Sequence, residues 1–270
     1  MEASTLLFAF SLTLLAGLST GIGGLLAFFT KKTNTKFLSL ALGFSAGVMI
    51  YVSFVDIFPL ANKALVEGLG LIPGSWATVA AFFAGMILIA VIDKIIPEFE
   101  NVHEVRRVEE MEDEKEAAKF RKLHRLGLFT AISIAIHNFP EGLATFVSAI
   151  IAPKHGIAIA FAVAIHNIPE GIAVAIPIYY ATRSRKKALF YSFVAGLAEP
   201  LGALVGFMFL SSILNGVAIG ALFAAVAGIM VFISLDELLP TAMEYGESHL
   251  VIYGLMAGMM TMAVSLLLFL

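Results

Sequence analysis

Cysteine is absent from this 270-residue chain, and charged residues make up only 14% of it. Without cysteine the chain can form neither disulfides nor thiolate metal ligands, so any metal site must use His, Asn, Asp, Glu or Met. Soluble globular domains usually contain about 25% charged residues, whereas 60% of this chain is hydrophobic. The composition therefore excludes an ordinary soluble domain and indicates a protein embedded in a lipid bilayer.

Apolar stretches long enough to cross a bilayer, about 20 residues each, recur along the whole chain. They lie near residues 5–29, 37–60, 75–96, 126–151, 157–180, 188–213, 217–240 and 249–270. Most connections between them are short, and the one long polar segment covers about residues 97–125. The sequence therefore predicts a single all-α transmembrane domain over residues 1–270. We expect a polytopic membrane helix bundle of eight transmembrane helices with its long loop in the cytoplasm.

Basic residues gather in alternate loops, which predicts how the chain is oriented. Fifteen of the 17 Lys and Arg residues fall between spans one and two, three and four, or five and six. Only Lys63 and Lys154 fall on the other side. Because cytoplasmic loops carry the excess of positive charge, we expect both termini outside a cell membrane. The first span has only Glu2 before it and lacks the basic start of a cleaved signal peptide, so we expect it to be retained.

Two pairs of segments repeat within the chain. AIHNFPEGLA at residues 135–144 matches AIHNIPEGIA at residues 164–173 at eight of ten positions. AGVMIYVSFVDIFP, from Ala46, matches AGIMVFISLDELLP, from Ala227. In each pair the matched spans differ by an odd number, so the copies cross the membrane in opposite directions. The sequence thus predicts an inverted-topology repeat, which is typical of secondary transporters whose site lies at the repeat interface.

The repeated His-Asn-x-Pro-Glu-Gly motif places metal-binding side chains at mid-membrane. Residues four apart share a helix face, so His137 and Glu141 can hold one ion with Asn138 beside them. Carboxylates at this depth cost about 2.5 to 3.5 kcal/mol each, so they need a cation or protons nearby. With Glu199, near the middle of span six, the candidate ligands are His137, Asn138, Glu141, His166, Asn167, Glu170 and Glu199. This nitrogen and oxygen set suits zinc, iron(II), manganese or cobalt better than copper(I).

The proline and glycine of each motif copy have predicted backbone roles. Pro140 and Pro169 lack an N–H, so each leaves one carbonyl of the preceding turn free and predicts a kink. Irregular backbone survives in a bilayer where it is buried in protein or lines a polar cavity. Gly142 and Gly171 keep the neighbouring helix surface slim. Both features favour a site at this level of the bundle.

Other polar residues carry weaker signals. Asp56 and its repeat partner Glu237 lie toward opposite ends of their spans, and we hypothesise that they draw cations into two vestibules. The alternative is that both simply lie at the headgroup level. Met49 could add a thioether ligand, but methionine at a helix interface more often packs. His103 and His124 lie in the charged loop segment, and two separated histidines are weak evidence for metal sensing.

On its two motif copies, His137-Asn138-Phe139-Pro140-Glu141-Gly142 and His166-Asn167-Ile168-Pro169-Glu170-Gly171, the chain resembles the ZIP (Zrt/Irt-like) metal-transporter family, and within it the bacterial zinc-uptake, ZupT-type branch. The resemblance implies uptake into the cytoplasm and a 3+2+3 helix arrangement with a two-metal site in spans four to six. It implies zinc as substrate, with iron(II), manganese, cobalt and cadmium also accepted, and no separate cofactor. The loop lacks the His-rich run common in the family.

When the family's ligand positions are transferred to the two motif copies, the resemblance implies two sets of metal ligands. One metal position would use His137, Glu141, His166 and Glu170. The second would use Asn138, Glu141, Asn167, Glu170 and Glu199. We expect metal ions and lipid as partners and no nucleic acid, with a homodimer left open.

Two functions of other classes stay open at this point. An intramembrane metalloenzyme could hold a catalytic zinc at mid-membrane, but the His-Glu-x-x-His pattern that supplies zinc ligands and a general base is absent. A metal-gated receptor without net transport is the other, and the absence of an attached signalling domain disfavours it. We therefore expect a transporter and not an enzyme.

Overall fold

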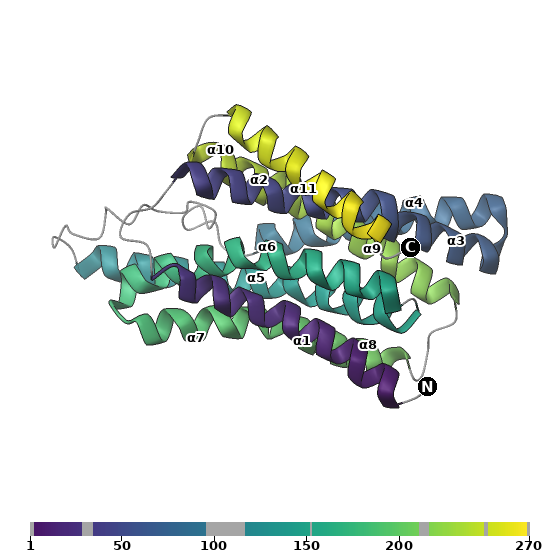
Figure 1. Ribbon diagram of the computed structural model, residues 1–270, viewed down its shortest axis with the longest axis horizontal. Helices are drawn as coiled ribbons and strands as arrows, with labels where there is room; N and C mark the ends of the chain where they lie inside the picture. The colour runs from purple at the N-terminus through teal and green to yellow at the C-terminus, as the bar shows by residue number, and fades with distance from the viewer. Residues whose placement is uncertain are drawn as a thin grey trace.

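In the computed structural model the protein is a bundle of long helices that run roughly along one direction (Figure 1). The structure describes residues 3–28, 35–95, 117–151, 153–210, 216–245 and 248–268, and within these ranges it contains helices and no strand. The helices are α1 (Ala3–Leu26), α2 (Thr35–Val52), η1 (Ser53–Ile57), α3 (Phe58–Leu69), α4 (Leu71–Ile95), α5 (Ala117–Ile151), α6 (Pro153–Thr182), α7 (Arg185–Gly196), α8 (Ala198–Leu210), α9 (Gly216–Ile233), η3 (Ser234–Leu238), α10 (Leu239–Tyr245) and α11 (Ser248–Leu268).

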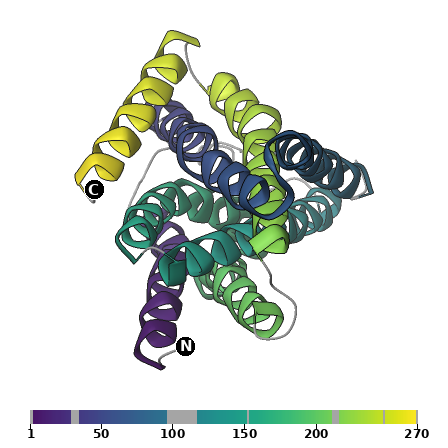
Figure 2. The same cartoon turned by 90° about the vertical axis from the view of Figure 1, so that its right-hand side faces the viewer.

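Eight segments of this part are long and apolar enough to cross a membrane, which confirms the predicted all-α bundle. They are Ala3–Leu26, Ser39–Leu69, Leu71–Lys94, Ile134–Ile151, Gly156–Ile176, Arg185–Met208, Gly216–Met243 and Ser248–Leu268. The two chain ends lie at the same end of the bundle in both views (Figures 1 and 2). An even number of crossings requires this arrangement.

The predicted span limits were wrong where helices continue past their apolar part. Span two continues through α3 to Leu69 instead of ending near residue 60, so Lys63 lies within a helix. After Gly70, whose φ of 90° suits glycine, α4 begins at Leu71. Helix α5 begins at Ala117, so its first turns lie in the charged 97–125 segment, ahead of the apolar stretch predicted near residues 126–151. A hydropathy pattern indicates which residues cross the hydrocarbon core, but it does not indicate helical turns that continue beyond the core.

Spans two and seven each contain one π-helical segment. These segments, η1 and η3, occupy corresponding positions of the sequence repeat, because Ser53 aligns with Ser234. They carry Asp56 and Glu237. Single π turns within helices occur often at functional sites. The repeat therefore preserves a local backbone irregularity as well as a sequence pattern.

The helices pack as two groups that lie side by side (Figures 1 and 2). One group contains α1, α5, α6, α7 and α8, and the other contains α2, α3, α4, α9, α10 and α11. Contacts between the groups are sparser and come mainly from α2 with α6 and α5 with α9. The cluster described below lies in the first group.

Small residues allow close packing between several helices. A methyl group added to Gly43 would lie 2.5 Å from the Val251 carbonyl oxygen on α11. One added to Gly17 would lie 3.2 Å from Pro200 on α8. Side chains at these glycines would force the helices apart, as expected for small-residue interfaces in lipid.

Candidate metal centre

The predicted ligands come together from α5, α6 and α8. Helix α5 supplies two of them, α6 supplies three and α8 supplies one: Asn138, Glu141, His166, Asn167, Glu170 and Glu199. All six are buried, with at most 2% of any residue exposed. The seventh candidate, His137, has its backbone in α5, but its side chain lies outside the described part of the chain.

Span six is broken just before its carboxylate. Helix α7 ends at Gly196, Leu197 forms a turn, and α8 begins at Ala198, so Glu199 lies in the first turn of α8. The positive end of the α8 dipole favours a carboxylate there. This break was not predicted from the sequence. The residue that could have indicated the break is Pro200, because it has no N–H to bond the carbonyl of Gly196.

Two side-chain contacts join the motif copies. His166 Nε2 lies 3.1 Å from Glu141 Oε2, which links α6 to α5. In one orientation the Asn138 amide donates to the Ala195 carbonyl at 3.3 Å. Turned over, it donates to Glu170 Oε2 and to the Ile134 carbonyl, each at 3.2 Å, and this orientation matches donors to acceptors better. In each motif copy, one oxygen of the glutamate therefore contacts a side chain of the other copy: Glu141 contacts His166, and Glu170 contacts Asn138.

Asn167 connects α6 to two further helices. Its amide Nδ2 donates to Glu199 Oε1 on α8 and to the Ala16 carbonyl on α1, the latter at 2.9 Å. Glu199 is therefore held toward the same region as the two motif copies. The involvement of α1 was not predicted from the sequence, because a backbone carbonyl leaves no residue-type signal.

Several oxygens in this cluster lack hydrogen-bond partners. They are Glu141 Oε1, Asn167 Oδ1, Glu170 Oε1 and Glu199 Oε2, all buried. A buried acceptor without a partner is costly, and a divalent cation would satisfy these oxygens. Among the side chains that the structure describes, no three His, Cys, Asp or Glu groups form a closed metal-ligand cluster. The members of the cluster contact each other in pairs.

The sequence matches the family model described as ZIP Zinc transporter over residues 98–266, more than half of the chain. The chain belongs to the ZIP family. It is 63% identical over 261 residues to the zinc transporter ZupT of Streptococcus mutans, covering 97% of each chain. It is 59% identical over 277 residues to the zinc transporter ZupT of Clostridium perfringens, covering 98% of this chain and 97% of that one. Since ZIP proteins are transporters, this membership also sets the metalloenzyme alternative aside.

The weaker candidates of this ZIP family member fall outside the cluster. Met49 is fully buried within the apolar core, where it packs. Asp56 is half-buried on η1, whereas Glu237 on η3 is buried, with 7% of the residue exposed. His103 and the side chain of His124 lie outside the part that the structure describes.

The motif glycines bring the neighbouring helices into contact. A methyl group on Gly142 would lie 2.5 Å from the carbonyl carbon of Glu199 on α8. One on Gly171 would lie 2.9 Å from the backbone nitrogen of Gly24 on α1. Both distances are too short for a real side chain. The absence of a side chain at Gly142 thus lets α8 bring Glu199 beside the motif, whereas Gly171 lets α1 pack against α6.

Replacing Asn167 with alanine is expected to destabilise the protein by about 1–3 kcal/mol, because Glu199 Oε1 and the Ala16 carbonyl lose their donor. Thermal unfolding in detergent measures this loss. Asn62→Ala is the matched control: Asn62 accepts from Thr78, which keeps the Gly74 carbonyl as an acceptor at 2.8 Å. Equal stability of the two variants would contradict the role assigned to Asn167.

Proposed function

We propose that this protein carries zinc ions across the membrane into the cytoplasm through the cluster on α5, α6 and α8. The observation that carries the proposal is the set of buried oxygens without partners on helices from both motif copies. The relatives' shared name, zinc transporter, supports zinc as the principal substrate. Because the ligands are nitrogen and oxygen, iron(II), manganese and cobalt are further substrates in this proposal. Cadmium is included on the family resemblance alone.

The proposed site holds two ions. One is bound by His137, Glu141, His166 and Glu170, and the other by Asn138, Glu141, Asn167, Glu170 and Glu199. Glu141 and Glu170 belong to both sets. Glu141 contacts His166 through one oxygen, and the other oxygen has no partner; Glu170 likewise has one oxygen near Asn138 and one without a partner. This division of each carboxylate supports a bridging role.

Alternating access through an inverted repeat is the proposed mechanism. It pairs spans two and seven, and spans four and five. Suppose that span one also pairs with span six, and span three with span eight. The helix contacts then match under this pairing: the contact of α2 with α11 corresponds to that of α9 with α4, and the contact of α1 with α6 corresponds to that of α8 with α5. The matched π segments η1 and η3 support the same pairing. Movement of the two helix groups past each other would then expose the site to either side in turn.

The proposed setting is a cell membrane with both termini outside. The exposed residues Arg185, Lys186 and Lys187 begin α7 at the end of the bundle opposite the termini (Figure 1). Positive charge at that end supports a cytoplasmic location for it. A homodimer is compatible with the proposal, which requires only one chain for each site.

Neutralising Asp56 and Glu237 together, by Asp56→Asn and Glu237→Gln, is expected to slow zinc uptake about tenfold, because the vestibules no longer concentrate cations. Equilibrium zinc binding should change much less, since neither residue is a proposed ligand. Uptake into proteoliposomes and binding in detergent measure the two effects. Unchanged uptake at low ionic strength would remove the vestibule role.

Transport itself is tested by following radioactive zinc into sealed proteoliposomes against protein-free vesicles. We expect saturable accumulation that unlabelled iron(II), manganese, cobalt and cadmium reduce by competition. Saturable zinc binding to the purified protein with no accumulation would favour the metal-gated receptor instead. Competition by none of the four ions would restrict the substrate to zinc.

A further inference from the structure

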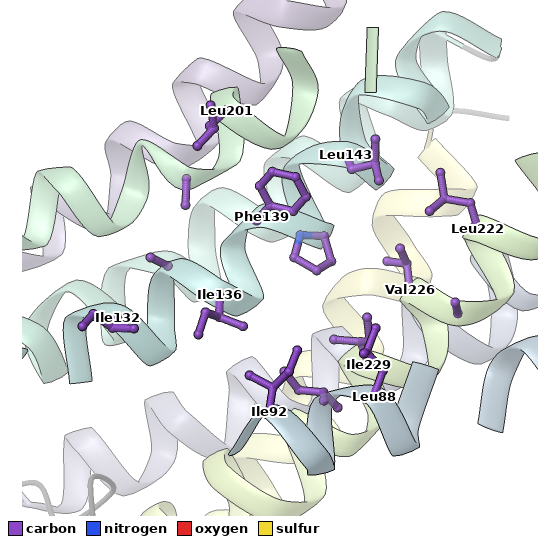
Figure 3. Close-up of a pocket in the computed structure, with 15 residues that line it drawn as sticks. Leu88, Ile92, Ile132, Ile136, Phe139, Leu143, Leu201, Leu222, Val226 and Ile229 are labelled. Atoms are coloured by element: carbon purple, nitrogen blue, oxygen red, sulfur yellow. The ribbon is translucent and has the colours of Figure 1, made fainter. Parts of the chain in front are cut away.

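A cavity of about 570 Å³ lies between α4, α5, α8 and α9 (Figure 3). Every residue that lines it is apolar, and we call it the apolar groove. Leu88 on α4 and Leu222 on α9 form one wall, and Ile136 and Phe139 on α5 with Leu201 on α8 form the other. No charged or hydrogen-bonding side chain takes part, so the groove is unsuited to a metal ion or to a polar substrate.

The apolar groove separates the two helix groups. Helices α4 and α9 pack on each other in one group, and α5 and α8 pack on each other in the other. Across the groove the groups touch mainly where α5 meets α9. The α5 wall includes Phe139 and Pro140, which immediately precede Glu141 in the metal cluster. Whatever fills the groove therefore contacts both groups beside the metal cluster.

The edge of the apolar groove is formed by exposed residues of two membrane-spanning segments, which a bilayer would cover. Leu88 and Leu201 line it and are 54% and 53% exposed, and both belong to membrane-spanning segments. Water is a poor occupant, because it needs two or more polar partners and the walls offer none. An unfilled groove would forfeit the dispersion contacts of its walls. The hydrocarbon that adjoins the opening is the material available to fill it.

We propose that one acyl chain of a bilayer phospholipid occupies the apolar groove and contacts both helix groups. Its walls contact the chain only through apolar groups, so recognition depends on the hydrocarbon and not on the headgroup. Because both groups bound the groove, its shape changes when they move past each other. A bound chain therefore favours the arrangement seen here. Binding of the chain does not depend on the proposed zinc transport and can be tested without it.

Native mass spectrometry of protein reconstituted with one phospholipid and then extracted into mild detergent tests the proposal. The unaltered protein is expected to retain one lipid, equally for phosphatidylglycerol and phosphatidylethanolamine. Ala225→Phe fills the groove from α9 and should lower retention by at least about tenfold. Ala80→Phe adds the same bulk at an exposed α4 position that does not line the groove, and should retain the lipid.

Leu222→Trp narrows the same groove and replaces Ala225→Phe if that variant fails to elute as a single species. The unaltered protein gives a second test, with a phospholipid that carries a photoreactive diazirine midway along one acyl chain. We expect crosslinks on both α5 and α9 that survive detergent exchange. Crosslinks confined to exposed faces such as that of Leu15, no retained lipid, or retention set by the headgroup would each overturn the proposal.

Discussion

Glu170→Gln is expected to lower the initial rate of zinc uptake into proteoliposomes by about 100-fold or more. The amide keeps the size of the side chain but removes a negative oxygen donor that the proposal shares between two ions. Loss of a residue that only supports a metal ligand already costs about 10- to 100-fold in affinity or activity, so loss of a bridging ligand should cost at least the upper value.

The matched control for this variant is Glu67→Gln. Glu67 is exposed on α3, away from the cluster, and its neutralisation should leave uptake within about twofold, as for most surface changes. Both variants should elute as single species and unfold at similar temperatures. Uptake by Glu170→Gln at the rate of the Glu67→Gln control would show that Glu170 is not a ligand on the transport path.

Gly142→Ala is expected to lower stability by about 1–3 kcal/mol or more and to lower zinc affinity with it. The added methyl group would lie against the backbone of Glu199, including its carbonyl carbon at 2.5 Å. Since backbone cannot rotate away as a side chain can, α8 must shift, and Glu199 moves with it. Thermal unfolding and equilibrium zinc binding in detergent measure the two losses.

Gly216→Ala makes the same substitution where a methyl group meets nothing within 4 Å. Gly216 is the first residue of α9, where the preference for alanine that holds in a helix interior does not apply, so this control should stay within about 1 kcal/mol of the unaltered protein. A Gly142→Ala protein as stable as the Gly216→Ala control, and with unchanged zinc affinity, would mean that α8 does not rely on this close contact.

The cluster could be predicted from the sequence because its information is local. Glu170 follows His166 by four positions, which places both on one face of α6, and the same pattern recurs on α5. The two copies lie in consecutive spans that cross the membrane in opposite directions, and each copy is near the middle of its span. The two sets of side chains were therefore expected at a similar depth. Glu199 was predicted on weaker grounds, its depth and the following proline, and the structure places it in contact with Asn167.

What the sequence did not reveal depends on contacts between distant segments. The break at Leu197 and the π turns η1 and η3 are backbone adjustments that hydropathy does not encode. The Ala16 carbonyl that accepts from Asn167 carries no residue-type signal. The apolar groove arises where four helices from two groups fail to meet, which only the assembled bundle determines.

The most direct test of the account compares zinc binding and zinc uptake by the unaltered protein and by the double variant His166→Ala, Glu170→Ala, each reconstituted in matched amounts. The variant is expected to insert and purify normally, yet to lose both high-affinity binding and saturable uptake. Uptake retained at the unaltered rate would contradict it, because zinc would then cross the membrane without the cluster on α5, α6 and α8.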